Sequence, residues 1–281
     1  MKIAILSKFT KEDECKYGEL VAQKALELGA EVVSVYDFES CDKFDKYKFV
    51  ASDTTAILAG DIIVIVGGDG TIIHYAKLAA KYKKPILGVN VGTVGALAAI
   101  EKNEIDKIEK LILKKYNITS RMMLDVKFDD KIVTALNDVV IHRDVFSPIS
   151  KYTVNKNGKV ICSYISDGII CSTSTGSTAY SLSAGGPMLE PTLDCVVVTP
   201  ICAHSMFAKS IVLGAEKPLE IEYDITKSSN IALIVDGNVQ TLNYENANNV
   251  EISRSLLEAQ FITFPEDNFY SRVVSKLSAK I

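Results

Sequence analysis

The chain has 281 residues, 48% of them hydrophobic and 23% charged, which is enough for one large or two modest globular domains with a real core. The formal net charge is −4, so nothing suggests a nucleic-acid-binding surface, and a phosphorylated ligand would need local devices such as loops and helix N-termini. Apolar runs such as Ile62–Val66 fall far short of the ~20 residues of a membrane span, which argues against a membrane protein.

Short apolar runs in the first part of the chain predict four buried strands, at Ile3–Leu6, Val32–Tyr36, Ile62–Val66 and Pro85–Val89. Stretches with apolar residues at three- and four-residue steps predict helices over Tyr17–Leu28, Ile72–Tyr82 and 104–116. Buried runs that alternate with amphipathic helices are typical of a doubly wound, mostly parallel sheet. We therefore expect an α/β domain over residues 1–118.

From about residue 120 onward the helical pattern nearly disappears. Short β-rich stretches replace it, at Leu124–Phe128, Ile132–His142, Tyr152–Val154, Val160–Ile165, Cys195–Thr199, Leu219–Tyr223, Ile231–Val235 and Val250–Ile252. Asn155–Gly158 predicts a hairpin turn, and Ser177–Ala184 is the one segment that could open a helix. We expect a β-rich, sandwich-like domain over 119–264, followed by a helical segment, 265–281, that returns to the first domain.

The cysteines and histidines lack the spacing of metal or redox sites. The six cysteines, at 15, 41, 162, 171, 195 and 202, include no Cys-x-x-Cys pair, and the three histidines are equally scattered. The first apolar run is also too short for the core of a secretory signal, which needs about 7–15 residues. We therefore expect reduced thiols, no all-protein metal site and a cytoplasmic location.

A glycine-rich loop follows the third predicted strand and precedes a helix: Gly67, Gly68, Asp69, Gly70 and Thr71. Glycines let backbone N–H groups approach phosphate oxygens, and a helix N-terminus adds partial positive charge. Ligands of open α/β sheets bind at the carboxyl ends of the strands, which is where the aspartate stands. The alternative is a tight turn in which Asp-Gly is only good turn chemistry. The combination in this context favours a phosphate-binding loop.

Two further segments are unusually rich in polar residues. Asp167-Gly168 is followed by the hydroxyl-rich run Ser172–Gly186, which offers donors and acceptors to a ribose and a base. Serine and threonine are also ordinary helix caps and turn formers, so a structural role stays open. Asn137-Asp138 interrupts an apolar stretch, and the alternative there is that both side chains merely face water.

Together these segments resemble the NAD kinases along nearly the whole chain. The Gly-Gly-Asp-Gly-Thr loop, an Asn-Glu-like pair, Ser-Asp-Gly, the run Thr175–Pro187 and Gly-x-Asn-x-Gly-x-x-Gly at Gly88–Gly95 occur in the family's order and spacing. The first loop is shared with lipid kinases, whereas the long Ser/Thr run is much more restrictive. The resemblance implies an N-terminal α/β domain, a C-terminal β-rich domain and an active site between them, often completed by a neighbouring subunit.

The resemblance also implies roles for individual residues. Asp69 would face the 2′-hydroxyl of the NAD ribose as proton acceptor. The residues implied to bind NAD are Asp69, Gly70, His74, Asn137, Asp138, Asp167, Thr175, Thr178, Ala179, Tyr180, Ser181, Leu182, Ser183 and Asn238. Those implied to hold the ATP phosphates are Gly67, Gly68, Gly70 and Thr71. ATP, a divalent metal such as Mg²⁺ or Mn²⁺, and NAD would be the ligands, and the protein would form a homodimer or homotetramer.

Some positions depart from the family's pattern. Asp138 stands where Glu is more usual, and Asn238 where Gln often occurs. Ile165 occupies a position that is Arg in many bacterial relatives, which removes a possible phosphate partner. Ala96 replaces a common Phe, and Ser174 and Ala203 replace frequent prolines. His204, like His74, is as compatible with a structural role as with a pocket-lining one.

Two other functions remain as alternatives. A lipid kinase of the diacylglycerol or sphingosine type would share the glycine-rich loop but would need a greasy acceptor pocket, against which the run Thr175–Ser183 argues. A non-catalytic NAD(P)-sensing module would bind the dinucleotide without turnover, and it would have no need for a carboxylate at Asp69 beside a phosphate.

Overall fold

The computed structural model describes residues 1–36, 47–92, 95–144, 147–224, 231–240 and 248–278. Packing divides the chain into two units, Met1–Ser120 with Ala259–Ile281 and Arg121–Glu258. Cys41, Thr93-Val94 of the glycine-rich stretch and the last three residues of the predicted C-terminal helical segment lie outside the described residues. In the described part of the chain, no helix is both long and apolar enough to cross a membrane.

The first unit is built on a parallel sheet whose strands follow the order β3-β2-β1-β4-β5. These strands are β1 (Lys2–Leu6), β2 (Glu31–Ser34), β3 (Tyr47–Phe49), β4 (Ile62–Gly67) and β5 (Ile86–Asn90). The short β6 (Ile100–Glu101) and the last part of β18 (Asn249–Thr263) also pair with β5 in parallel. Every residue of β4 is buried, as expected for a central strand covered on both faces.

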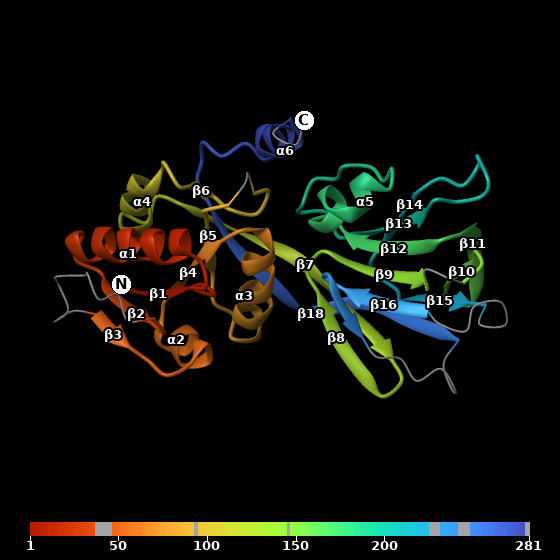
Figure 1. Ribbon diagram of the computed structural model, residues 1–281, viewed down its shortest axis with the longest axis horizontal. Coiled ribbons are helices and arrows are strands. Elements are labelled where there is room, and N and C mark those ends of the chain that lie inside the picture. Colours follow the sequence, from red (N-terminus) through yellow and green to blue (C-terminus); the bar gives the residue numbers. More distant parts are fainter. Residues whose placement is uncertain (37–46, 93–94, 145–146, 225–230, 241–247, 279–281) are drawn as a thin grey trace. The chain divides into compact units, whose positions relative to one another are not determined.

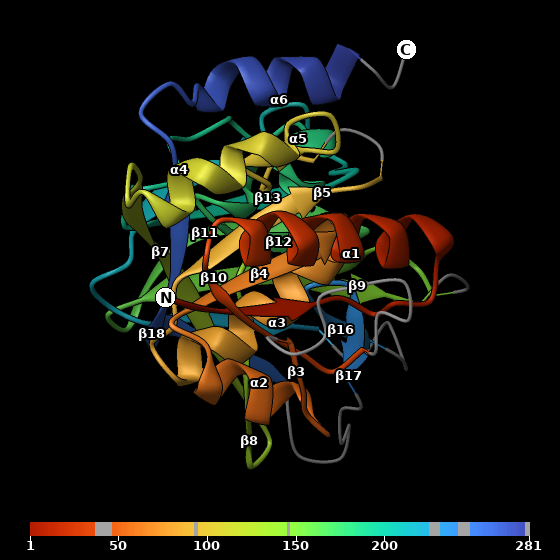
Figure 2. The same cartoon turned by 90° about the vertical axis from the view of Figure 1, so that its left-hand side faces the viewer.

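Helices cover both faces of this sheet. They are α1 (Glu12–Glu27), α2 (Asp53–Ala59), α3 (Asp69–Lys81), α4 (Ile108–Ile112, preceded by a 3-10 turn over Ile105–Lys107) and α6 (Phe269–Ser278). Helices α1 and α4 lie on one face, and α2 and α3 lie on the other (Figure 1 and Figure 2). Val21 and Ala25 of α1 pack with Ile3 and Ile5 of β1 in one buried cluster. The arrangement is doubly wound, as predicted.

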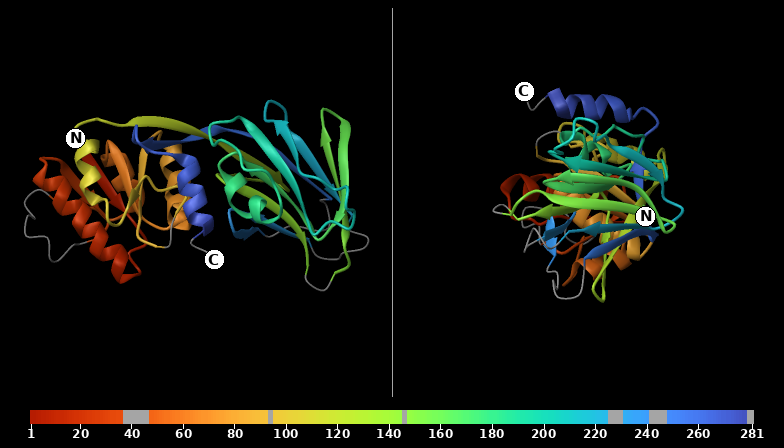
Figure 3. Two further views of the ribbon diagram at one scale, coloured as in Figure 1. Left: turned by 90° about the horizontal axis from the view of Figure 1, so that it is seen from above. Right: turned by 90° about the vertical axis from the view of Figure 1, so that its right-hand side faces the viewer.

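The second unit is a sandwich of two sheets (Figure 3). The strands new to it are β7 (Asn117–Phe128), β8 (Lys131–Ala135), β9 (Asp138–Arg143), β10 (Ser150–Lys156), β11 (Lys159–Ser166), β12 (Gly168–Thr173), β13 (Cys195–Ile201), β14 (Ile211–Gly214), β15 (Leu219–Tyr223), β16 (Ile231–Val235) and β17 (Asn238–Gln240). One layer runs β11-β10-β15-β18 with β7 and β8, and the other runs β14-β13-β12-β9-β16-β17. Side chains from both layers, among them Leu124, Tyr152, Ile141 and Val198, form one buried core.

Several predicted elements differ from the observed ones. The single strand predicted over Ile132–His142 is wrong, because the chain turns at Leu136-Asn137 and β8 and β9 join different sheets. The helix predicted over 104–116 is shorter, and 117–128 belong to one long strand. Ser177–Ala184 holds only a 3-10 turn and the one-turn helix α5 (Tyr180–Ser183). The elements β3, α2, β6, β12, β14 and β17 were not predicted.

Candidate functional site

The glycine-rich loop forms the connection between β4 and α3 in the first unit. The backbone N–H groups of Thr71 and Ile72 donate to the carbonyl of Gly68, which closes the first turn of the helix. None of the three glycines has a positive φ, so a left-handed turn conformation is not the reason for glycine at these positions. A Cβ at Gly67 would lie 2.7 Å from the Thr71 Cβ, whereas at Gly68 or Gly70 it would meet nothing within 4 Å. The space in front of the last two glycines is therefore open to a ligand.

Asp69 begins α3 and is held by a second loop. Its Oδ2 accepts the N–H of Ala96 at 3.1 Å, and its Oδ1 accepts the N–H of Leu97 at 3.2 Å. A Cβ at Gly95 would lie 2.8 Å from Oδ1, so only glycine permits this approach. Asp69 as a whole is half-buried.

The last residues of β5 and β6, Asn90 and Glu101, support this second loop. The Asn90 side chain, which is buried, donates to Glu101 Oε2 at 2.8 Å and accepts the N–H of Gly92 at 3.2 Å. Burial raises the pKa of Glu101; the Asn90 hydrogen bond opposes that rise, and the Glu104 and Asp69 charges add to it. Asn90 belongs to the predicted Gly88–Gly95 motif, whereas Glu101 was not predicted, because a single glutamate carries no pattern.

A turn between β8 and β9 carries Asn137 and Asp138 in the second unit. The backbone N–H groups of Leu136, Asn137 and Asp138 all donate to the Asp236 carboxylate, at 2.8, 2.8 and 3.2 Å. Asp236 occupies the β16–β17 turn with a φ of 47°. The sequence analysis missed its role, although Asp236-Gly237 is a turn dipeptide, because the partner lies about a hundred residues earlier.

Asn137, Asp138 and the start of the hydroxyl-rich run meet in the structure. A Cβ at Gly176 would lie 2.0 Å from the carbonyl oxygen of Asn137, so the run packs directly on that backbone. Asp138 is buried, and this burial raises its pKa to about 7, with the Asp236 charge adding to the rise. Among the described residues, the buried atoms Asn137 Oδ1, Ser172 Oγ and Thr175 Oγ1 have no hydrogen-bond partner. Such atoms are costly unless a ligand or water satisfies them.

Other hydroxyls of the run are used within the fold. Ser174 Oγ donates to the carbonyls of Pro191 and Leu193 at 3.1 and 2.7 Å. Ser177 Oγ donates to the Ser174 carbonyl at 2.7 Å. Ser181 is fully buried, and its Oγ lies 2.9 Å from Thr199 Oγ1. In these three serines the hydroxyl therefore has a structural role, because it bonds to other groups of the protein.

The remaining predicted residues of the run differ in exposure. Thr178 is buried with its Oγ1 3.4 Å from the Thr175 carbonyl, and Ala179 and Leu182 are half-buried. Tyr180 and Ser183 are exposed, on and at the end of the one-turn helix α5.

Asp167 lies at the opposite end of β12 from this cluster. The register pairs Gly168 with His142 and Ser172 with Asp138, so the length of the strand separates the two aspartates. Asp167 Oδ1 accepts Arg143 Nε at 2.8 Å in a partly buried ion pair. Arg143 was not among the predicted site residues, because its pairing with Asp167 depends on the register of β9 and β12.

Three predicted or discussed residues lie on the surface. Asn238 is exposed, and its amide donates to the Asp236 carbonyl at 3.2 Å, within the hairpin turn. His74 is exposed on α3, and its ring lies edge-on to Tyr75. The backbone N–H of His204 donates to the Ile165 carbonyl at 2.9 Å, beside a cavity of about 460 Å³ that Tyr164 and Phe207 also line.

No group of three or more His, Cys, Asp or Glu side chains suited to a metal ion occurs in the part of the chain that the structure describes.

Comparisons with known proteins agree with this arrangement. The model of the ATP-NAD kinase N-terminal domain matches residues 7–116, and that of the ATP-NAD kinase C-terminal domain matches residues 136–264. The curated NAD kinase of Acetivibrio thermocellus is 36% identical over 243 residues, which cover 84% of this chain and 83% of that protein.

Two solved structures share the fold. Yeast NADH kinase, complexed with NADH, matches with a TM-score of 0.84 and 22% identity, over 99% of this chain and 87% of that one. An NAD kinase from Archaeoglobus fulgidus, in complex with ATP, matches with a TM-score of 0.76 and 23% identity, over 99% of both chains. The predicted combination of an α/β fold and a β-rich fold is thereby confirmed.

Proposed function

The chain belongs to the NAD kinase family, and we propose that its reaction transfers the γ-phosphate of ATP to the 2′-hydroxyl on the adenosine ribose of NAD, giving NADP and ADP. Both family models and a curated relative 36% identical support this assignment. The observation on the molecule that carries it is the placement of Asp69. Its carboxylate is oriented by two backbone N–H groups at the end of a central strand, next to glycines that leave open space.

The proposed step needs little covalent chemistry from the protein. The 2′-hydroxyl oxygen attacks the γ-phosphorus, and the bond from that phosphorus to the β–γ bridging oxygen breaks, so ADP leaves. Phosphoryl transfer passes through a loose transition state, and catalysis is mostly positioning and charge stabilisation. A carboxylate is a weak base toward an alcohol, so Asp69 would orient the hydroxyl and take its proton late in the step.

Gly67, Gly68, Gly70 and Thr71 are the proposed phosphate-binding residues. The loop ends in the N-terminus of a 13-residue helix, where backbone N–H groups and the helix dipole favour an anion. His74 stands one helical turn further and is exposed, within the same surface. We propose that ATP arrives as a complex with a divalent metal such as Mg²⁺ or Mn²⁺, which neutralises phosphate charge. Removal of the metal with a chelator should then abolish turnover, and turnover that survives would contradict this.

We propose that NAD is bound mainly by residues of the second unit. The carboxylate of Asp138 can accept hydrogen bonds from ribose hydroxyls, and the side-chain amide of Asn137 can donate to and accept from the ribose and the base. The partnerless atoms Asn137 Oδ1 and Thr175 Oγ1 support this assignment, because a polar ligand would satisfy both. The other residues proposed to line the dinucleotide site are Asp69, Gly70, His74, Asp167, Thr178, Ala179, Tyr180, Ser181, Leu182, Ser183 and Asn238. For the buried Ser181, the contribution would come through the backbone.

We further propose a homodimer or homotetramer in the cytoplasm. The oligomeric state follows from the family resemblance, and the location from cysteine usage without paired spacing. Sedimentation velocity at micromolar concentration should give a species of at least two chains. A monomer at all concentrations would contradict the first proposal, and fractionation that places the protein outside the cytoplasm would contradict the second.

An assay with several candidate phosphate acceptors tests the proposed function against its alternatives. With ATP and Mg²⁺, purified protein should release ADP in the presence of NAD, and chromatography should identify NADP as the product. Dispersed diacylglycerol or sphingosine should give no ADP above background. Activity on the lipid but not on NAD would establish the lipid kinase, and NAD binding without ADP release would establish the sensor.

A further inference from the structure

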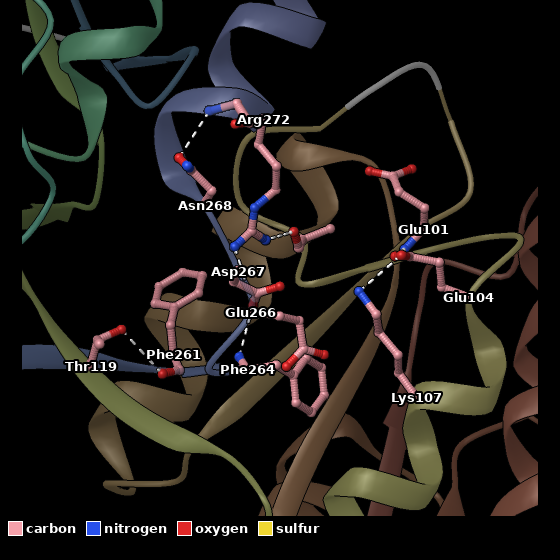
Figure 4. A network of polar contacts seen from close by, with 12 residues as sticks. Glu101, Glu104, Lys107, Thr119, Phe261, Phe264, Glu266, Asp267, Asn268 and Arg272 are labelled. Carbon is pink, nitrogen blue, oxygen red and sulfur yellow. Dashed lines mark hydrogen bonds and ion pairs between the residues drawn. The ribbon is translucent and has the colours of Figure 1, made fainter.

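The C-terminal helix α6 reaches the loop that orients Asp69. Arg272, on the second turn of α6, donates from Nη1 to the carbonyl of Ala98, the residue after Leu97. Figure 4 shows the guanidinium extending from the helix into the turn below it. All of these residues belong to the first unit. A residue 174 positions later in the sequence therefore touches the segment whose N–H groups hold the Asp69 carboxylate.

Other contacts join this loop to the sheet. The N–H of Ala99 donates to the Gly88 carbonyl at 3.1 Å, and the Asn90–Glu101 hydrogen bond ties its far end. The two N–H groups that hold Asp69 lie between Gly95 and Ala98. Ala98, the next residue after Leu97, is buried and packs on β5, where a Cβ at Gly88 would lie 3.0 Å from its Cα. Its carbonyl is the group through which Arg272 reaches this segment.

The guanidinium is itself held in place. Its Nη2 lies 3.3 Å from Asp267 Oδ2, and the same carboxylate oxygen accepts the N–H of Phe264 at 2.7 Å. Asp267 thus fixes both the end of β18 and the side chain of Arg272. The planar guanidinium can bond the carbonyl and the carboxylate at once in a fixed geometry, which a lysine ammonium cannot reproduce. Glu101 and Glu104 also feel its positive charge.

We propose that Arg272 is a positioning residue for Asp69, acting through the Ala98 carbonyl to hold the 95–98 loop in the geometry that orients the carboxylate. The proposal rests on the proposed role of Asp69 in NAD phosphorylation. Asp69 must meet a reacting hydroxyl at hydrogen-bond distance, and a misplacement of about 1 Å can cost 10²-fold in rate. Loss of Arg272 should therefore act on turnover more than on substrate binding.

The test compares Arg272→Gln and Arg272→Lys with the control Lys110→Gln in the full-length enzyme. Lys110 forms an ion pair with Glu266, so the control removes another cation that ties the same C-terminal segment, but it does not touch the 95–98 loop. We expect kcat to fall about tenfold or more in Arg272→Gln, with the KM values for NAD and ATP within about threefold of wild type. Arg272→Lys should recover only part of the loss, and Lys110→Gln should leave kcat unchanged.

Hydrogen exchange supplies a readout that does not depend on activity. The amides of Ala96 and Leu97 should exchange faster in both Arg272 variants and at the wild-type rate in Lys110→Gln. An unchanged kcat, unchanged exchange, or full recovery by lysine would overturn the proposal. If Arg272→Gln does not fold, Arg272→Lys carries both measurements. A wild-type enzyme without activity on NAD would refute the proposed function instead, while faster exchange would still show that Arg272 holds the loop.

Discussion

Both carboxylate oxygens of Asp69 accept backbone N–H groups, so the side chain has lost its rotational freedom within the fold itself. An orientation fixed by backbone groups needs no reorganisation when the reacting hydroxyl arrives. The glycine at 95 makes this possible, because any larger residue would place a Cβ against Oδ1. The role that we assign to Asp69 therefore depends on Gly95, the last glycine of the Gly88–Gly95 motif.

Asp138 is a second carboxylate whose environment determines its chemistry. Its pKa in the fold is about 7, whereas a free aspartate has a pKa of ~3.9. Between these values the folded protein binds more protons at this site than the unfolded chain does. Wild-type stability should therefore fall as pH rises through this window, because the buried group must ionise.

Asp138→Asn removes this ionisation and keeps the shape of the side chain. We expect the variant to gain stability relative to wild type as pH rises from 5 to 8, by roughly 2–3 kcal/mol in the free energy of unfolding. Urea unfolding at both pH values measures this difference. Parallel stability profiles for the two proteins would show that Asp138 is ionised throughout the range.

At the scale of elements, glycine has two different roles in the β4–α3 connection. Gly67 is required for packing, since a Cβ there would collide with Thr71. Gly68 and Gly70 have neither a positive φ nor a crowded Cβ direction. The fold does not require glycine at these two positions, so we assign the requirement to a bound phosphate that approaches the backbone.

Gly70→Val tests that assignment. Its side chain should enter open space and leave the thermal unfolding midpoint close to that of wild type, while the KM for ATP rises by about tenfold or more, which is ~1.4 kcal/mol of binding. Gly70→Ala should give a smaller rise. Gly176→Ala is the contrasting control, because its Cβ would collide with the Asn137 carbonyl and destabilise the fold. Unchanged kinetics in Gly70→Val would refute the phosphate-loop assignment.

The parallel sheet could be predicted well because its strands are short, continuous apolar runs. Strands β1, β4 and β5 agree with the predicted runs to within about one residue at most ends, since strands buried on both faces leave that pattern directly in the sequence. The break at Leu136-Asn137 could not be predicted in the same way. An apolar run shows that residues are buried, but it does not show that they change from one sheet to another.

The unpredicted parts of the candidate site depend on contacts between distant residues. Asp236 and Arg272 act on segments about 100 and 174 positions away, and neither belongs to a local pattern. Arg143 pairs with Asp167 only because two antiparallel strands bring them into register. Motifs marked the residues that we propose to face ligands, whereas the residues that hold those motifs in place became visible only in three dimensions.

At the scale of the whole molecule, each unit contains one part of the proposed reaction. The first unit carries the phosphate loop and Asp69, and its C-terminal residues return to it through β18 and α6. The second unit carries Asn137, Asp138 and the hydroxyl-rich run on a sandwich with its own core. A kinase with this division should need both units for turnover, since neither contains all of the proposed groups.

The most direct test of the central claim is a coupled assay. Purified protein receives NAD, ATP and Mg²⁺, and an NADP-specific dehydrogenase reports the product. We predict a signal that requires ATP and that falls about 100-fold or more in kcat in Asp69→Asn, with the KM for NAD changed far less. An absent signal in the wild-type protein would contradict the proposed reaction. A signal that persists in Asp69→Asn would contradict the role assigned to that carboxylate.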